Sequence, residues 1–184
     1  MMFDIVSVIS KHTAFLENKL LQLDLSQRKS IGKAFIRLFF LLPNAKECIK
    51  HNLKIEIEED KILSDLENNN LQYFKDALKN YNAEIDEYAD NFEELEPMEI
   101  NIISGFENCV NAFQKSEYAL YNFLLLIDIL DYYENFSENR EYWNNILKEE
   151  IEFQQRIAEQ ISNGESIEEN IYLERYKNIP FEDI

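Results

Sequence analysis

The chain has 184 residues, 46% of them hydrophobic and 13% aromatic, so it can bury a core of its own without disulfides or a structural metal. It contains only three glycines and three prolines, too few for the many turns of a β sandwich, and this predicts an all-α fold. With 36 acidic and 18 basic residues the net charge is −18, which makes nucleic acids and anionic membrane surfaces poor partners. The charge permits attraction to a basic protein, although its first effect is solubility and many soluble proteins are simply acidic.

The first part of the chain is predicted to form amphipathic helices. Apolar residues recur every three or four positions over residues 3–23, and Ser26 is predicted to cap a second helix. Pro43 interrupts that helix, and Asn44 can cap a further turn. The second helix also carries basic residues spaced by four in one row, which we interpret as a solvated face: Lys29, Lys33 and Arg37.

The middle of the chain is predicted to alternate between short helices and breaks. Leu53–Asp60 alternates apolar and polar residues, which predicts an extended connection that leads into an acidic helix start. A helix over Lys61–Lys79 is expected to break at the asparagines Asn68–Asn70, and a short helix is predicted over Asn82–Leu95. Pro97 stands at a favourable first position of the following helix.

The segment Tyr118–Tyr133 is apolar or aromatic at nearly every position. A helix that is apolar on all sides is normally buried on all sides, so we predict the central helix of a single-domain, irregular bundle of about six to eight helices. A membrane span is not favoured, because Asn122 and Asp128 interrupt the segment and its flanks are acidic. The predicted bundle domain covers 1–164, followed by a short C-terminal helix and tail at 165–184.

After the central helix, a long amphipathic helix is predicted at roughly Arg140–Ser162, and Glu150 falls at the same helical spacing as its apolar residues. Ser166 and Glu169 match a capping box for the last short helix. The final residues, 178–184, are predicted to be loose or loosely docked.

The sequence offers little material for catalysis. Cys48 and Cys109 lack metal-binding spacing and are expected to be small buried side chains in a reducing compartment. The only histidines are His12 and His51, and no phosphate-binding or nucleophile motif occurs. We therefore predict no catalytic residues, no cofactor and no metal site. The N-terminus lacks signal-peptide features, so a cytoplasmic location is expected.

An acidic block is the strongest functional lead. No Lys or Arg occurs between Lys79 and Lys115. Carboxylates with interspersed aromatic rings could steer and anchor a basic partner, although an acidic solvated helix with its rings turned to its own core gives the same pattern. The candidate partner-binding residues are Glu84, Asp86, Glu87, Tyr88, Asp90, Glu93 and Glu94.

Asp128 is a candidate buried acid, because it lies within the apolar central segment. It could be a pocket acid. The interpretation that we favour is structural: a partner such as Arg37 or a tyrosine hydroxyl, or a position at the rim of the bundle.

Two stretches resemble a bacterial family of helical proteins, the domain of unknown function 416. One is Arg37-Leu38 with Leu42-Pro43-Asn44 at the end of an apolar helix, and the other is EIEFQQRIAEQI at Glu150–Ile161. The resemblance covers about Leu16–Ile161. It implies an all-α fold without an established activity, and a suggested genomic association with histidine kinases implies a role in signalling.

Three functions remain open at this point. The leading hypothesis is a non-enzymatic protein-binding or signalling-accessory module. One alternative is an immunity protein that neutralises a basic toxin through the acidic block, and another is an enzyme with a carboxylate-lined pocket. The oligomeric state is left open, with a dimer among the alternatives.

Overall fold

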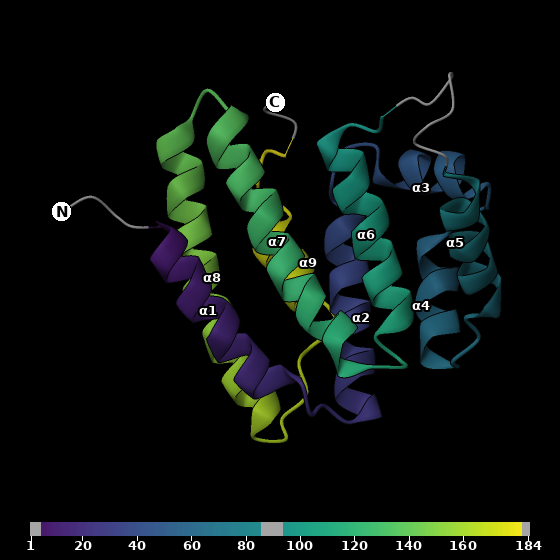
Figure 1. Cartoon of the computed structure of the whole chain (residues 1–184). Coiled ribbons are helices and arrows are strands. Elements are labelled where there is room, and N and C mark those ends of the chain that lie inside the picture. The colour runs from purple at the N-terminus through teal and green to yellow at the C-terminus, as the bar shows by residue number, and fades with distance from the viewer. Residues whose placement is uncertain (1–4, 86–93, 182–184) are drawn as a thin grey trace.

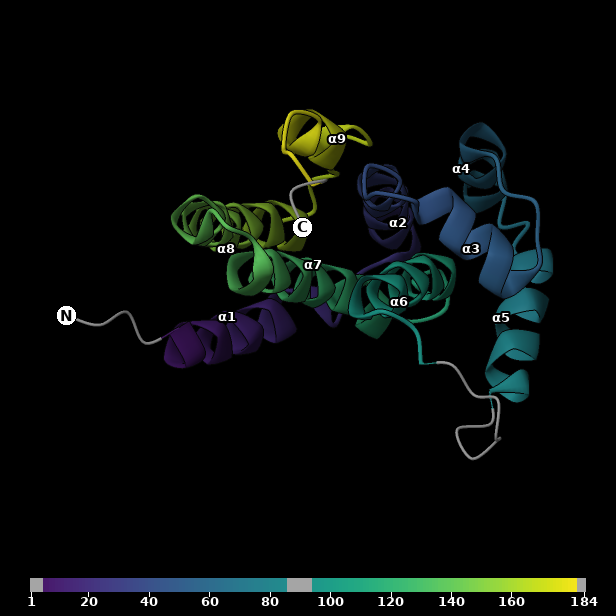
Figure 2. The ribbon, with the colours of Figure 1, turned by 90° about the horizontal axis from the view of Figure 1, so that it is seen from above.

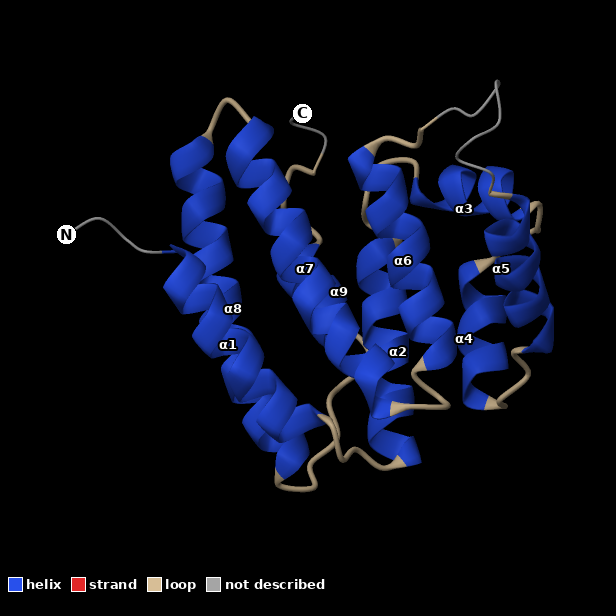
Figure 3. Ribbon diagram, viewed as in Figure 1, coloured by secondary structure: helices blue, strands red, loops and turns tan. Residues whose placement is uncertain are grey.

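The computed structural model describes residues 5–85 and 94–181, and the described residues form nine helices and no strand (Figures 1 and 3). The all-α fold class is confirmed, with more helices than the six to eight that were predicted. The helices are α1 (Ile5–Leu20), α2 (Leu25–Phe39), α3 (Ala45–Leu53), α4 (Glu59–Glu67), α5 (Gln72–Glu84), α6 (Pro97–Asn111), α7 (Ser116–Phe136), α8 (Arg140–Ser162) and α9 (Ile171–Tyr176).

Helix α7 lies at the centre of the bundle and packs against α1, α2, α6 and α8 (Figures 1 and 2). Phe123, Ile127 and Leu130 are among its buried side chains, so the predicted central helix is confirmed. The prediction that it is buried on all sides is wrong. No described helix covers the side of α7 between α1 and α6, and Tyr121 is 45% exposed.

Helices α2 and α6 connect α7 to the outer helices α3, α4 and α5 (Figure 2). Gly105 of α6 allows the close approach to α2, because a Cβ atom there would lie 2.7 Å from the ring of Phe39. Phe39 and Phe106 are both buried at this junction. The core is therefore continuous from α8 across α7 to α2 and α6.

Several helix ends differ from the prediction in detail. Asp24, and not Ser26, caps α2: its carboxylate accepts the Gln27 backbone N–H at 2.9 Å, and the Gln27 side chain accepts the Asp24 N–H at 3.0 Å. Asn44 precedes α3 as predicted, but with φ of 57° and no side-chain cap bond. The break between α4 and α5 is confirmed, and Asn69 turns the chain there with φ of 56°.

The connection between α3 and α4 has the predicted alternation. Ile55 and Ile57 are buried, while Glu56 and Glu58 are exposed, and α4 then begins at Glu59. Of the predicted helix Asn82–Leu95, the first three residues belong to the end of α5, and most of the remainder lies outside the described residues.

The C-terminal segment packs firmly on the bundle as far as it is described. Tyr172, Tyr176 and Phe181 are all buried, and the Tyr133 hydroxyl donates a hydrogen bond to the backbone oxygen of Phe181 at 2.6 Å. The prediction of a loose end is therefore wrong for residues 178–181. The physical reason is that Phe181 packs its ring against both Tyr133 and Trp143, with centroids 5.4 and 5.8 Å away.

Candidate functional site

The acidic block is only partly placed. Glu84 ends α5 and Glu94 precedes α6, and both are exposed. Glu84 forms an ion pair with Lys54 at 2.5 Å. The other candidates lie outside the described residues: Asp86, Glu87, Tyr88, Asp90 and Glu93. The interpretation of this block as a binding surface stays a prediction.

Asp128 is exposed on α7, so the prediction of a buried acid is wrong. It occupies the rim of the bundle, one of the structural alternatives for this residue. Desolvation by the neighbouring side chains, followed by repulsion from the Asp131 carboxylate, raises the pKa of Asp128. Among the described residues no Lys or Arg pairs with Asp128. Arg37, the basic partner suggested by the sequence, binds Glu169 and Glu59 instead.

The uncovered side of α7 carries a row of mostly apolar residues at helical spacing, which we name the α7 outer stripe. Its members are Tyr118, Tyr121, Leu124, Asp128, Tyr132 and Phe136. Phe136 is 66% exposed and Tyr121 45% exposed, while Tyr118, Leu124 and Tyr132 are half-buried. From Tyr118 to Phe136 the stripe is about 27 Å long, at about 1.5 Å per residue.

Aromatic contacts order both ends of the α7 outer stripe. The rings of Tyr118 and Tyr121 pack edge to face with centroids 5.9 Å apart, and those of Tyr132 and Phe136 lie 4.7 Å apart. The charge of the helix is entirely negative, because α7 contains four carboxylates and no Lys or Arg. The stripe therefore presents paired rings at its two ends and a carboxylate near its middle.

A second polar feature lies inside the bundle and not on its surface. Glu150 of α8 is fully buried, and it accepts hydrogen bonds from Arg175 at 2.8 Å and from the Tyr176 hydroxyl at 2.7 Å. Burial raises the pKa of Glu150, and the charge of Arg175 with these hydrogen bonds only partly opposes this. Sequence reasoning missed this site, although Glu150 at the spacing of an apolar helix face was the available signal.

The same buried region includes a histidine. His12 Nε2 donates to Gln154 Oε1 at 2.8 Å, and Gln154 Nε2 donates to the backbone oxygen of Phe123 at 2.9 Å. Burial lowers the pKa of His12, with the Gln154 hydrogen bond opposing. Since His12, Gln154 and Glu150 are all closed off from solvent, these groups hold α1, α7, α8 and α9 together and cannot reach a substrate.

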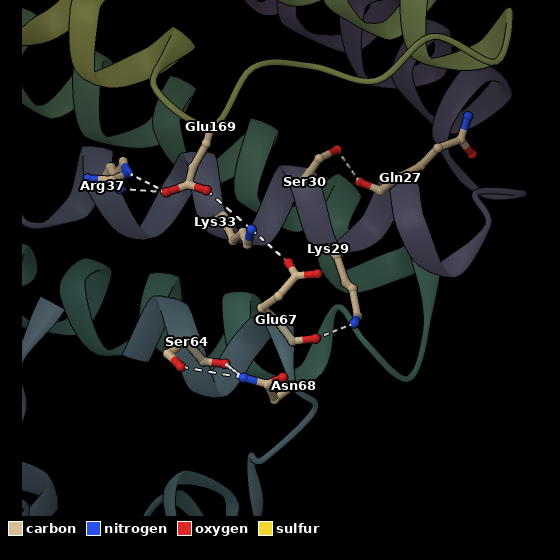
Figure 4. Close-up of polar contacts among 9 residues, drawn as sticks. All are labelled: Gln27, Lys29, Ser30, Lys33, Arg37, Ser64, Glu67, Asn68 and Glu169. Carbon is tan, nitrogen blue, oxygen red and sulfur yellow. Dashed lines mark hydrogen bonds and ion pairs between the residues drawn. The ribbon is translucent and has the colours of Figure 1, made fainter. Parts of the chain in front are cut away.

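The row of basic residues on α2 is not a solvated face. Figure 4 shows that Arg37 binds Glu169 and that Lys33 bridges Glu67 and Glu169, at 2.7 and 3.2 Å. Lys29 donates to the backbone oxygen of Glu67. The row thus fastens α4 and the segment before α9 onto α2. Because Glu169 is occupied in this way, the predicted capping box with Ser166 does not form, and Asn170 precedes α9 without a side-chain cap bond.

Two surface hollows lie against α5 in the part of the chain that the structure describes. One of about 250 Å³ lies between α3 and α5 beside Lys54, Tyr73 and Glu84, and another of about 270 Å³ lies between α5 and α6 beside Lys79 and Glu107. Neither includes Asp128, and neither is lined by a Ser, Thr, Cys or His side chain.

Both cysteines are buried, as predicted. Burial and the nearby Glu99 raise the pKa of Cys48 to about 11, so this thiol is not a ready nucleophile. Within 5–85 and 94–181, no group of three or more His, Cys, Asp or Glu side chains is placed to hold a metal ion.

Among the described helices, none has the combination of length and apolar content that crossing a membrane requires. No family model matches the sequence, and comparison with curated proteins and with solved structures finds no similar protein. The resemblance to the domain of unknown function 416 therefore stays a prediction.

Proposed function

We propose that this protein is a non-enzymatic binding module that recognises a basic protein partner through the α7 outer stripe. The observation that carries the proposal is that the central helix leaves Tyr121 and Phe136 exposed about two turns on either side of the exposed Asp128, on a helix without any basic residue. Both rings pack on a half-buried tyrosine of the same helix, Tyr118 and Tyr132 respectively, and much of their own surface stays open to a partner.

The composition of the stripe supports this proposal. Aromatic side chains are enriched among the residues that dominate the energy of protein interfaces, since they bury a large area with few rotatable bonds. Carboxylates around such anchors increase the association rate with a partner of opposite charge. The net charge of −18 acts in the same direction over longer range.

The alternatives have less support. An enzyme with a carboxylate-lined pocket would have to use the carboxylates that line the two hollows, which are Asp76, Glu84 and Glu107. Asp128 lies in neither hollow, and among the described residues no Ser, Thr, Cys or His lines either hollow beside these carboxylates. Neutralisation of a basic toxin through the acidic block depends on a segment most of which lies outside the described residues, so no described contact supports it. The acidic block around Glu84 and Glu94 is a further surface on which such a partner could be steered.

The proposal is tested with tagged protein expressed in its own cells. The wild type should capture a partner with a basic surface, and the capture should be lost in Tyr121→Ser/Phe136→Ser and weakened in Asp128→Asn. Tyr73→Ser is the matched control, because Tyr73 is 51% exposed on α5, away from the stripe. A partner that is held equally by all variants, or that is acidic, would contradict the proposal.

A further inference from the structure

We infer that the segment recognised by the α7 outer stripe is a basic amphipathic helix of the partner, which lies along α7 between α1 and α6. This inference rests on the proposed function and specifies the shape of the partner. The α7 outer stripe, with its exposed and half-buried residues, follows one side of a single helix for about 27 Å, which is the length of a helix of roughly 18 residues.

The flanking elements favour a helix. α1 and α6 both pack against α7 and border its uncovered side in both views, so a segment added along α7 would lie between these two helices (Figures 1 and 2). Helices pack at interaxial distances of about 8–10 Å by placing side chains between those of a neighbour, and a stripe spaced by three and four residues suits this packing. An extended strand would find no backbone partner there, because the N–H and C=O groups of a helix bond within the helix.

The charges specify where the partner helix must be basic. Asp128 lies near the middle of the stripe, and Asp131 follows within one turn. A Lys or Arg in the central turns of the partner helix would relieve the repulsion between these carboxylates. Phe136, two turns after Asp128 and 66% exposed, offers a ring on which a guanidinium can also pack.

A second copy of this chain is a poor occupant of the stripe. Residue 127 is the midpoint between Tyr118 and Phe136, so an antiparallel, two-fold pairing of two α7 helices would place both Asp128 side chains close to the symmetry axis. Like charges facing each other across a helix interface are destabilising. The stripe therefore suits a heterologous partner better than self-association.

The test uses a display library of random peptides of roughly 20 residues, long enough to match the stripe as a helix. Selection is made against the full-length protein, with the Tyr121→Ser/Phe136→Ser variant as the counter-target. The selected peptides should be basic, carry apolar residues spaced by three and four, and gain helical circular dichroism on binding. Their affinity should fall at least about tenfold in Phe136→Ser, remain unchanged in Tyr73→Ser, and fall less in Asp128→Asn.

The outcomes distinguish a failure of the helical partner segment from a failure of the proposed function. If the selected peptides are basic and bind α7 but show neither helical periodicity nor induced helix, the inference of a helical partner segment is wrong and the proposed function is unaffected. If no peptide distinguishes the protein from the counter-target, both are overturned. A homodimer of the full-length protein that dissociates in Phe136→Ser would identify a second copy as the occupant and would also overturn the inference.

Discussion

The ion pair between the buried Glu150 and the half-buried Arg175 supplies the sharpest test of how the C-terminal segment is held. Arg175→Met keeps the length of the side chain but removes the hydrogen bond to Glu150 at 2.8 Å and the packing of the guanidinium over Phe153 at 4.4 Å. A hydrogen bond to a charged group contributes about 1.5–3 kcal/mol and a cation–π contact about 0.5–1 kcal/mol, so we expect a loss of about 2–4 kcal/mol near neutral pH.

The loss should depend on pH in a defined direction. Without Arg175, Glu150 is a buried carboxylate whose pKa in the folded protein lies above its ordinary value of 4.5. The folded state then takes up a proton before the unfolded state as the pH falls, and this uptake stabilises the folded state. The cost of Arg175→Met should therefore be largest above the folded-state pKa of Glu150 and should shrink as the pH falls through it.

Urea unfolding at a series of pH values measures both quantities. Lys50→Met is the matched control, because Lys50 pairs with Glu56 at 2.7 Å but on the surface, and its loss should barely move the unfolding midpoint. The double variant Glu150→Gln/Arg175→Met should lose less unfolding free energy than the sum of the losses in the two single variants. A cost below about 1 kcal/mol that does not vary with pH would refute the idea that this pair holds the C-terminal segment.

Three further predictions concern the core and its titration, and each is measured by chemical unfolding. Phe123→Ala removes a fully buried ring and should cost about 3–5 kcal/mol; a cost within about 0.5 kcal/mol would contradict the central position of α7. Gly105→Ala should cost about 1–3 kcal/mol, since its Cβ meets the Phe39 ring at 2.7 Å, whereas Gly32→Ala, with its nearest contact at 3.4 Å, should be much milder. Because the pKa of His12 is lowered in the folded state, the unfolded chain binds the proton first, and stability should decline as the pH falls below 6.5; this slope should flatten in His12→Leu.

The fold class and the central helix could be predicted because they depend on composition and local pattern. The apolar run of α7 needs several neighbours to cover it whatever their order. Which side of α7 remains uncovered depends on how many helices reach it and at what angles. When a helix is apolar on all sides, its sequence does not indicate which side that is. The sequence therefore predicts Asp128 as a candidate buried acid with the rim of the bundle as one alternative, and only the packing shows that it lies at the rim.

Long-range partners explain the other differences. Ser166 and Glu169 have the spacing of a capping box, but Arg37, 132 residues away in sequence, holds the Glu169 carboxylate. Glu150 stood in the predicted apolar face of α8, and only the docking of Tyr176 and Arg175 explains why a carboxylate is tolerated there. In both cases the deciding contact comes from another part of the chain, so local patterns could not reveal it.

The pairing of α1 with α8 has a consequence for synthesis in the cell. His12 and Gln154 are separated by 142 residues, so the side of α1 that buries His12 has no cover until most of the chain has been made. At a synthesis rate of about 5–20 residues per second, this apolar face is exposed for roughly 7–28 s before Gln154 is made. The nascent chain therefore exposes an apolar helix face for much longer than a bundle built from adjacent helical hairpins would. The yield of folded protein in the cell should depend on chaperones that bind such helices during translation.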